Sequence, residues 1–212
     1  MTAVERKQNT ERLLKSLNIP FIDHLPLIEE EHEARIRTPQ EIAERILVLT
    51  YLNYVSEKPE DKDKVITFLK EQGLWNSVSN DEKELFSKEL SDEEHINISW
   101  RSEAIWLLLW VINKIETIDL PNEEVSIPQI LEMLPSFMTD TKNFVQSATI
   151  RKISEILDLS DLTYRLHWAT RNTELNKTEE LDLNSSIISE RHYAINWVTY
   201  YEEDWDDITT DT

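Results

Sequence analysis

The sequence predicts an all-α fold: a single compact domain of seven to nine helices around a buried, tryptophan-rich central helix. The chain of 212 residues contains one glycine, Gly73, whereas the tight turns of β-hairpins depend on glycine in Asn-Gly, Asp-Gly or Gly-X pairs. Apolar residues recur instead at the helical period of 3.6. The stretch 100–115 is apolar nearly all round, which is typical of a helix buried on most of its faces.

Residues 1–37 could form an N-terminal arm of this domain. The pattern predicts a helix over 4–17, which Asn-Ile-Pro ends, and then an extended connector over 21–27 between two prolines. The next helix begins at Thr38-Pro39-Gln40-Glu41, where a threonine N-cap precedes proline at the first helical position and glutamate at the third. Apolar residues continue this helix to Tyr54.

The middle of the chain predicts short helices separated by charged segments. Residues 57–64 form a charged linker, and the helix after it ends at Gly73, the expected left-handed cap. Asn80 or Asp81 should cap a short helix that runs to residue 90. An acidic loop over 91–94 then leads into the central helix.

The last third should hold further helices and a packed tail. Asp161 is a plausible N-cap within this region, and residues 172–184 are polar and loop-like. The acidic tail, 202–212, carries Trp205 and Ile208 at a spacing of three, so we expect it to pack on the core rather than fray. The helices are expected at 130–134, 147–157, 161–172 and 187–201.

Composition excludes several kinds of site. One glycine cannot build a phosphate-binding loop, a dinucleotide fingerprint or a nucleophile elbow, and the absence of cysteine excludes disulfides and thiolate metal sites. There are 42 acidic and 22 basic side chains, a net charge of -20. This charge disfavours nucleic acid and anionic membranes as partners. We expect a soluble, cytoplasmic protein with no cofactor.

Three stretches carry a resemblance to a known family. They are the run 100–110 (WRSEAIWLLLW), the run 161–169 (DLTYRLHWA), and the run 190–197 (ERHYAINW) with the ending 205–212 (WDDITTDT). The early segments Ile19-Pro20, Leu25-Pro26, Arg37 and 41–45 (EIAER) also fit. The chain resembles, over nearly its whole length, the bacterial family named domain of unknown function 4272. The resemblance implies no catalytic residues.

Charged residues stand beside tryptophans on otherwise apolar helices in these stretches. An unpaired buried charge is very costly, so we expect each arginine to meet a carboxylate, with Glu103, Glu190, Asp206 and Asp211 as the available partners. The candidate polar cluster consists of Arg101, Glu103, Arg165, His167, Arg171, Glu190, Arg191, Asp206 and Asp211.

This cluster has two interpretations. The first is a structural network of ion pairs that fixes how three helices and the tail dock. The second is a pocket for an anionic ligand, lined by Arg101, Arg165, His167 and Arg171.

Metal binding is not expected. Aspartates 206, 207 and 211 could hold a hard cation, but their spacing does not match an EF-hand loop, which needs a central glycine. Residues 29–33 (EEEHE) and 60–63 (EDKD) look like the magnesium site of all-α nucleoside-triphosphate pyrophosphatases. The proline at 59 and the lack of apolar neighbours favour a solvated run of charges instead.

The leading functional hypothesis is a non-enzymatic protein-binding module. Its most concrete version is an immunity-type protein that neutralises a basic bacterial toxin by charge complementarity, with its acidic residues gathered on one exposed face. The alternative is an enzyme or small-ligand binder that uses an Arg/His/Glu pocket on an anionic substrate. A third is a structural or regulatory scaffold.

Overall fold

A computed structural model of the chain describes residues 1–177 and 181–212. Within them the protein is a single all-α domain of nine α-helices and two 3-10 helices, with no strands, as the sequence predicted. The elements are α1 (Ala3–Ser16), α2 (Pro39–Glu57), η1 (Pro59–Asp61), α3 (Lys62–Glu71), η2 (Leu74–Ser77), α4 (Asn80–Ser87), α5 (Asp92–Val111), α6 (Ile127–Glu132), α7 (Lys142–Gln146), α8 (Ile153–Asn176) and α9 (Ser185–Val198).

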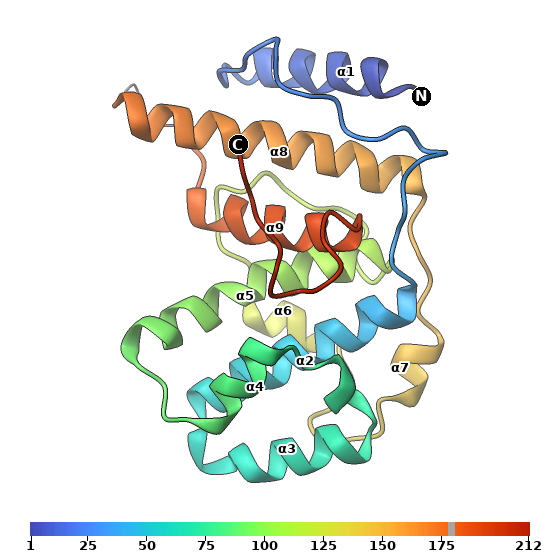
Figure 1. The fold of residues 1–212 in the computed structure, drawn as a ribbon, viewed down its shortest axis with the longest axis vertical. Coiled ribbons are helices and arrows are strands. Elements are labelled where there is room, and N and C mark those ends of the chain that lie inside the picture. Colours follow the sequence, from blue (N-terminus) through green and yellow to red (C-terminus); the bar gives the residue numbers. More distant parts are fainter. Residues whose placement is uncertain (178–180) are drawn as a thin grey trace.

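The long helices are stacked in layers (Figure 1). The central helix α5 packs between α2 and α9, α8 covers the other side of α9, and α1 lies on α8 as the outermost layer. Helices α3 and α4 and the 3-10 helix η2 lie at the opposite end, beside α2. Where the chain is described, no helix is long and apolar enough to cross a membrane.

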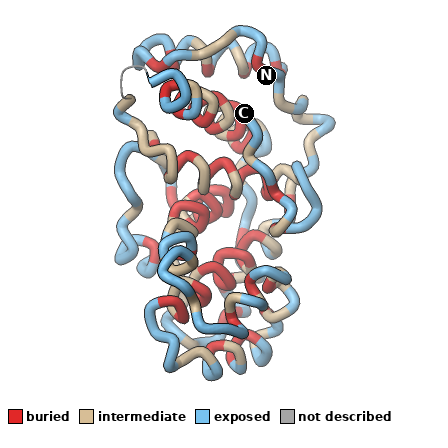
Figure 2. The backbone as a smooth tube through the Cα atoms, turned by 60° about the vertical axis from the view of Figure 1, so that its left-hand side comes forward, coloured by how far each residue is buried: buried red, intermediate tan, exposed pale blue. Residues whose placement is uncertain are grey.

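Two apolar clusters follow from this stack. The main core is built around α2, α5 and α9 and takes in Trp205 and Ile208 of the tail. A smaller outer cluster lies between α1, α8 and α9, with Leu14, Leu166 and Ile188 at its centre. Figure 2 shows this difference in burial: buried residues follow the central helices, and α1 is largely exposed.

Local sequence signals explain where most helices begin. Side-chain to backbone capping boxes start α1 at Thr2, α2 at Thr38, α4 at Ser79 and α5 at Ser91. Each one satisfies backbone donors that the first helical turn leaves free. The left-handed conformation expected of Gly73 is confirmed, with φ of 78° after α3.

Three expectations for the middle of the chain were wrong. The linker over 57–64 is mostly helical, because α2 runs to Glu57 and η1 leads directly into α3. The cap of α4 is Ser79 rather than Asn80 or Asp81. Residues 92–94 are the first turn of α5, not a loop, and the central helix therefore begins eight residues earlier than the apolar stretch suggests and ends at Val111.

The C-terminal third also differs from the prediction. The two helices expected over 147–157 and 161–172 are one continuous helix, α8, so Asp161 lies inside a helix and caps nothing. The short helix α7 was not predicted. The loop expected over 172–184 is shorter, because α8 extends to Asn176; its residues 178–180 lie outside the described part of the chain.

Candidate binding site

Three of the four arginines in the candidate polar cluster are paired with carboxylates, in three separate pairs. Arg191 Nη2 lies 3.0 Å from Glu103 Oε2, and Arg101 Nη1 donates to Glu190 Oε2 at 3.1 Å. These two pairs join α5 to α9. The third pair was not foreseen in this form, because Arg165 binds Asp161 one turn earlier on its own helix, with Nη2 2.8 Å from Oδ1.

The three ion pairs differ in how deeply their side chains are buried. The side chains of Arg165 and Asp161 are fully buried, and Arg165 also donates to the carbonyl of Pro26, which ties the N-terminal connector to α8. Burial lowers the pKa of Arg191, and the adjacent Glu103 opposes that shift. Arg101 is different, since about a quarter of its side chain remains exposed. The Arg101–Glu190 pair is therefore the most exposed of the three.

His167 forms a pair with another histidine, which the sequence did not single out. The Nδ1 atoms of His167 on α8 and His192 on α9 lie 2.8 Å apart, and both side chains are buried. Desolvation lowers the pKa of His167 to about 4 and that of His192 to about 3, helped by Arg171 in the first case and by His167 in the second. Both rings are therefore neutral near pH 7 and serve the packing of α8 on α9.

The acidic tail is held by alternating arginines and aromatic rings, named here the Arg–aromatic ladder. Its guanidinium carbons lie 4.2 to 5.8 Å from the ring centres, within the range of cation–π attraction. Along the ladder, Arg37 lies between Tyr200 and Trp197, Arg45 between Trp197 and Trp205, and Arg101 between Trp205 and Tyr193.

Two aspartates of the tail were expected to meet arginines and do not. Asp206 Oδ2 accepts the backbone N–H groups of Asn80 at 2.9 Å and Asp81 at 3.1 Å. It therefore stabilises the positive N-terminus of α4. Asp211 is exposed and accepts a hydrogen bond from the hydroxyl of Thr209. Arg171 is exposed as well and belongs to none of the three ion pairs.

The predicted pocket for an anion is consequently not assembled. Arg165 and His167 are buried and face partners inside the protein. Arg171 is exposed to solvent. Arg101 alone lines an open cavity.

That cavity, named here the tail pocket, has a volume of about 370 Å³ and lies between α4, α5, α9 and the tail. Tyr193 and Trp205 form an aromatic wall. Its carboxylates come from α4, from the first turn of α5 and from the tail, and one arginine and one lysine also line it. The acidic lining residues are Asp81, Glu82, Glu84, Glu94 and Asp206.

Two of these carboxylates are already neutralised. Glu82 accepts two hydrogen bonds from Arg45, both at 2.8 Å, and Glu94 binds Lys88. Among the described residues, no cation forms a salt bridge with Asp81, Glu84 or Asp206. The proximity of Asp206 raises the pKa of Asp81, with burial and Glu84 adding to the shift. Unbalanced negative charge is thus crowded at the mouth of the tail pocket.

Comparison with known proteins identifies the family. A model described as domain of unknown function (DUF4272) matches residues 6–208 of the 212. The chain belongs to the DUF4272 family. No curated protein and no solved structure matches it.

The family stretches contain part of the tail pocket that sequence reasoning missed. Tyr193 and Trp205 line the pocket and fall within runs that carry the resemblance, yet neither was proposed as a site residue. Asp81 and Glu84 carry no sequence signal beyond a helix start, because their significance depends on Asp206, which is more than 120 residues away.

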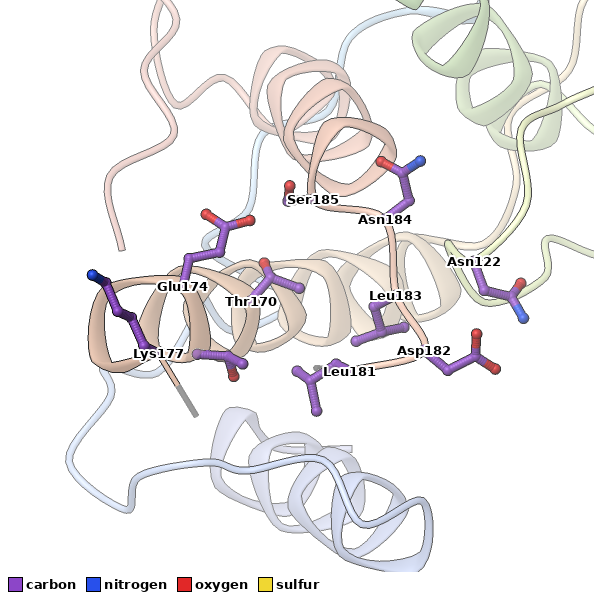
Figure 3. A pocket seen from close by; sticks show the side chains of 10 residues that line it. Asn122, Thr170, Glu174, Lys177, Leu181, Asp182, Leu183, Asn184 and Ser185 are labelled. Atoms are coloured by element: carbon purple, nitrogen blue, oxygen red, sulfur yellow. The ribbon is translucent and has the colours of Figure 1, made fainter. Parts of the chain in front are cut away.

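A second cavity of this DUF4272 chain, of about 560 Å³, lies at the C-terminal end of α8 (Figure 3). Glu174 of α8, Lys177 just after it and the segment from Leu181 to Ser185 line this cavity. None of the nine residues of the candidate polar cluster lines it. In the described ranges, no three histidine or acidic side chains are grouped so that they could hold a metal ion.

Proposed function

We propose that this protein binds a basic protein partner, and that a lysine or arginine side chain of the partner enters the tail pocket. The observation that carries the proposal is the crowding of Asp81, Glu84 and Asp206, without a cation of their own, at the mouth of a cavity. Like charges held together repel one another, and a guest cation would relieve that repulsion.

The aromatic wall supports the same kind of guest. Desolvation raises the pKa of Tyr193 to about 12, so its hydroxyl stays neutral and donates to the carbonyl of Trp205. The rings of Tyr193 and Trp205 already contact Arg101. Rings of this kind attract cations, at about 0.5 to 2 kcal/mol each.

The net charge of -20 favours fast encounter with a basic protein. An immunity-type role is the most specific version of the proposal, in which the partner is a basic toxin and the complex blocks it. The Arg101–Glu190 pair would then orient the aromatic wall without taking part in chemistry. No enzymatic reaction is proposed.

The test compares three immobilised forms of the protein as bait for lysate of the native host. They are the wild type, Asp81→Lys with Glu84→Lys, and the matched control Asp63→Lys with Glu71→Lys. The control reverses two exposed charges on α3, and Asp63, like Asp81, lies in the first turn of its helix.

We expect a basic protein that the wild type and the control retain and the tail-pocket variant loses, and whose retention falls as salt is raised. If both variants retain the same proteins as the wild type, the tail pocket is not the contact. The immunity-type version further requires that expression of the retained protein arrests growth and that co-expression of the wild type restores it.

A further inference from the structure

Helix α1 lies at the opposite end of the stack from α4 (Figure 1). An apolar groove runs along this helix. Two cavities, of about 520 and 280 Å³, share the side chains of Leu13, Ile118, Leu159 and Leu162 and therefore form one depression, named here the α1 groove. It shares no lining residue with the tail pocket.

Apolar side chains from three elements line the α1 groove without being covered. Leu13 and Leu17 of α1 are 42% and 39% exposed, and Leu159 of α8 is half-buried. The groove follows α1 from Arg6 to Leu17, a length of about 16 Å at 1.5 Å per residue. This matches about three turns of a second helix.

The uncompensated charge at the rim of the groove is negative. Within the groove, Arg6 Nε binds Asp158 at 2.8 Å and Arg151 binds Glu155 at 3.1 Å, so these charges are balanced internally. Glu116 and Asp119 are exposed on the segment that carries Ile118. Neither forms an ion pair within the described residues.

We infer that the α1 groove is a docking site for an amphipathic helix of another protein, with an apolar face directed into the groove and lysine or arginine along its flank. Helix-in-groove recognition uses apolar anchors at positions i, i+3 or i+4, and i+7, which the length of the groove accommodates. Basic flanking residues would face Glu116 and Asp119.

A second copy of the chain fits the groove less well. Each copy carries a charge of -20, so self-association would bring two strongly acidic surfaces together. The inference does not depend on the tail pocket, because the two surfaces use different residues. The experiment on the α1 groove can therefore contradict this inference without contradicting the proposed function of the tail pocket.

The probe is a fluorescein-labelled 14-residue peptide of leucine and lysine, with leucines at i, i+3, i+4 and i+7. Its control has the same composition with the leucines scattered around the helix. Binding is measured by fluorescence anisotropy at 150 mM NaCl, which screens non-specific attraction between exposed charges.

Two pairs of variants localise the binding. Leu13→Glu places a charge in the groove, and Val4→Glu places the same charge on α1 at a residue that is 49% exposed and lines neither cavity. Glu116→Lys with Asp119→Lys reverses the rim, and Glu123→Lys with Glu124→Lys reverses two exposed residues of the same segment. Thermal melts establish that each variant is folded.

We expect Leu13→Glu to weaken binding of the amphipathic peptide at least tenfold and the rim reversal to weaken it about fivefold more than its control does. Val4→Glu should change it less than twofold. Equal binding of the scattered peptide, or equal affinity of Leu13→Glu and Val4→Glu, would overturn the inference. So would a dimer in analytical ultracentrifugation that Leu17→Glu dissociates, because a second copy would then occupy the groove.

Discussion

The two ends of the stack are held together in different ways. Around α2, α5 and α9 the protein has a large apolar core. Its buried polar groups include arginines of the Arg–aromatic ladder, which lie against aromatic rings, and the Arg191–Glu103 ion pair. At the other end, α1 and the N-terminal connector are attached to α8 by buried arginines. Arg6 binds Asp158, and Arg165 binds Asp161 and the carbonyl of Pro26.

This difference shows how an outer layer can be fixed where little apolar area is available. An ion pair in the interior has a defined geometry but contributes little net stability, because desolvation offsets most of the attraction. The outer layer is therefore oriented by polar contacts while its leucines remain partly uncovered. An apolar groove beside α1 is the result.

The largest expected effect comes from breaking the buried pair on α8. Arg165→Ala leaves the carboxylate of Asp161 buried without a partner, which costs about 3 to 5 kcal/mol. Replacing both residues, as Asp161→Leu with Arg165→Met, should recover most of that loss because no charge remains buried. Urea unfolding measures both. A cost below about 1 kcal/mol for Arg165→Ala would mean that water reaches the pair.

The contact between α8 and α9, where the two regions meet, should lose stability at low pH. His167 and His192 join α8 to α9, and their pKa values of about 4 and about 3 lie below the ordinary value near 6.5. Since the unfolded chain binds these two protons more readily than the folded one, stability is lost as the pH falls from about 6.5 toward 4. The slope approaches about 2.5 kcal/mol per pH unit, because the two states differ by nearly two bound protons near pH 5.

The measurement is urea unfolding at pH 7.5, 6 and 5, for the wild type and for His167→Gln with His192→Gln. The double variant should be less stable at pH 7.5 but should lose less stability on acidification. The carboxylates titrate in both proteins, so the difference between the two slopes isolates the histidines. Parallel slopes would show that the histidine pair is already protonated or solvated in the folded state.

The sequence predicts those features whose cause is local. Thr38 and Glu41 lie three residues apart, and Gly73 acts on its own backbone, so both could be assigned without a structure. Asp161 shows the opposite case. An aspartate before an apolar helix has the same pattern whether it caps the helix or pairs with an arginine four residues later, and only the continuity of α8 from Ile153 through Asp161 distinguishes the two.

The site depends still more on distant contacts. That arginines meet carboxylates follows from the cost of buried charge, but which carboxylate each one meets depends on how the helices stack. Asp206 binds the N-terminus of α4 instead of an arginine, and the histidine pair joins residues 25 positions apart. The tail pocket exists only where the tail returns to α4, so no single stretch of sequence contains it.

The smallest expected effect comes from removing a helix cap. It compares the two regions directly, because the same threonine-to-alanine substitution can be made in the main core and in the outer layer. Thr38→Ala removes the cap of α2, which lies in the main core, and should cost about 1 kcal/mol of global stability in urea unfolding. Thr2→Ala removes an equivalent capping box from α1. If α1 opens locally before the core unfolds, Thr2→Ala should hardly change global unfolding but should speed amide hydrogen exchange in α1 about fivefold. Equal global costs for the two variants would show instead that the outer layer and the main core unfold as one unit.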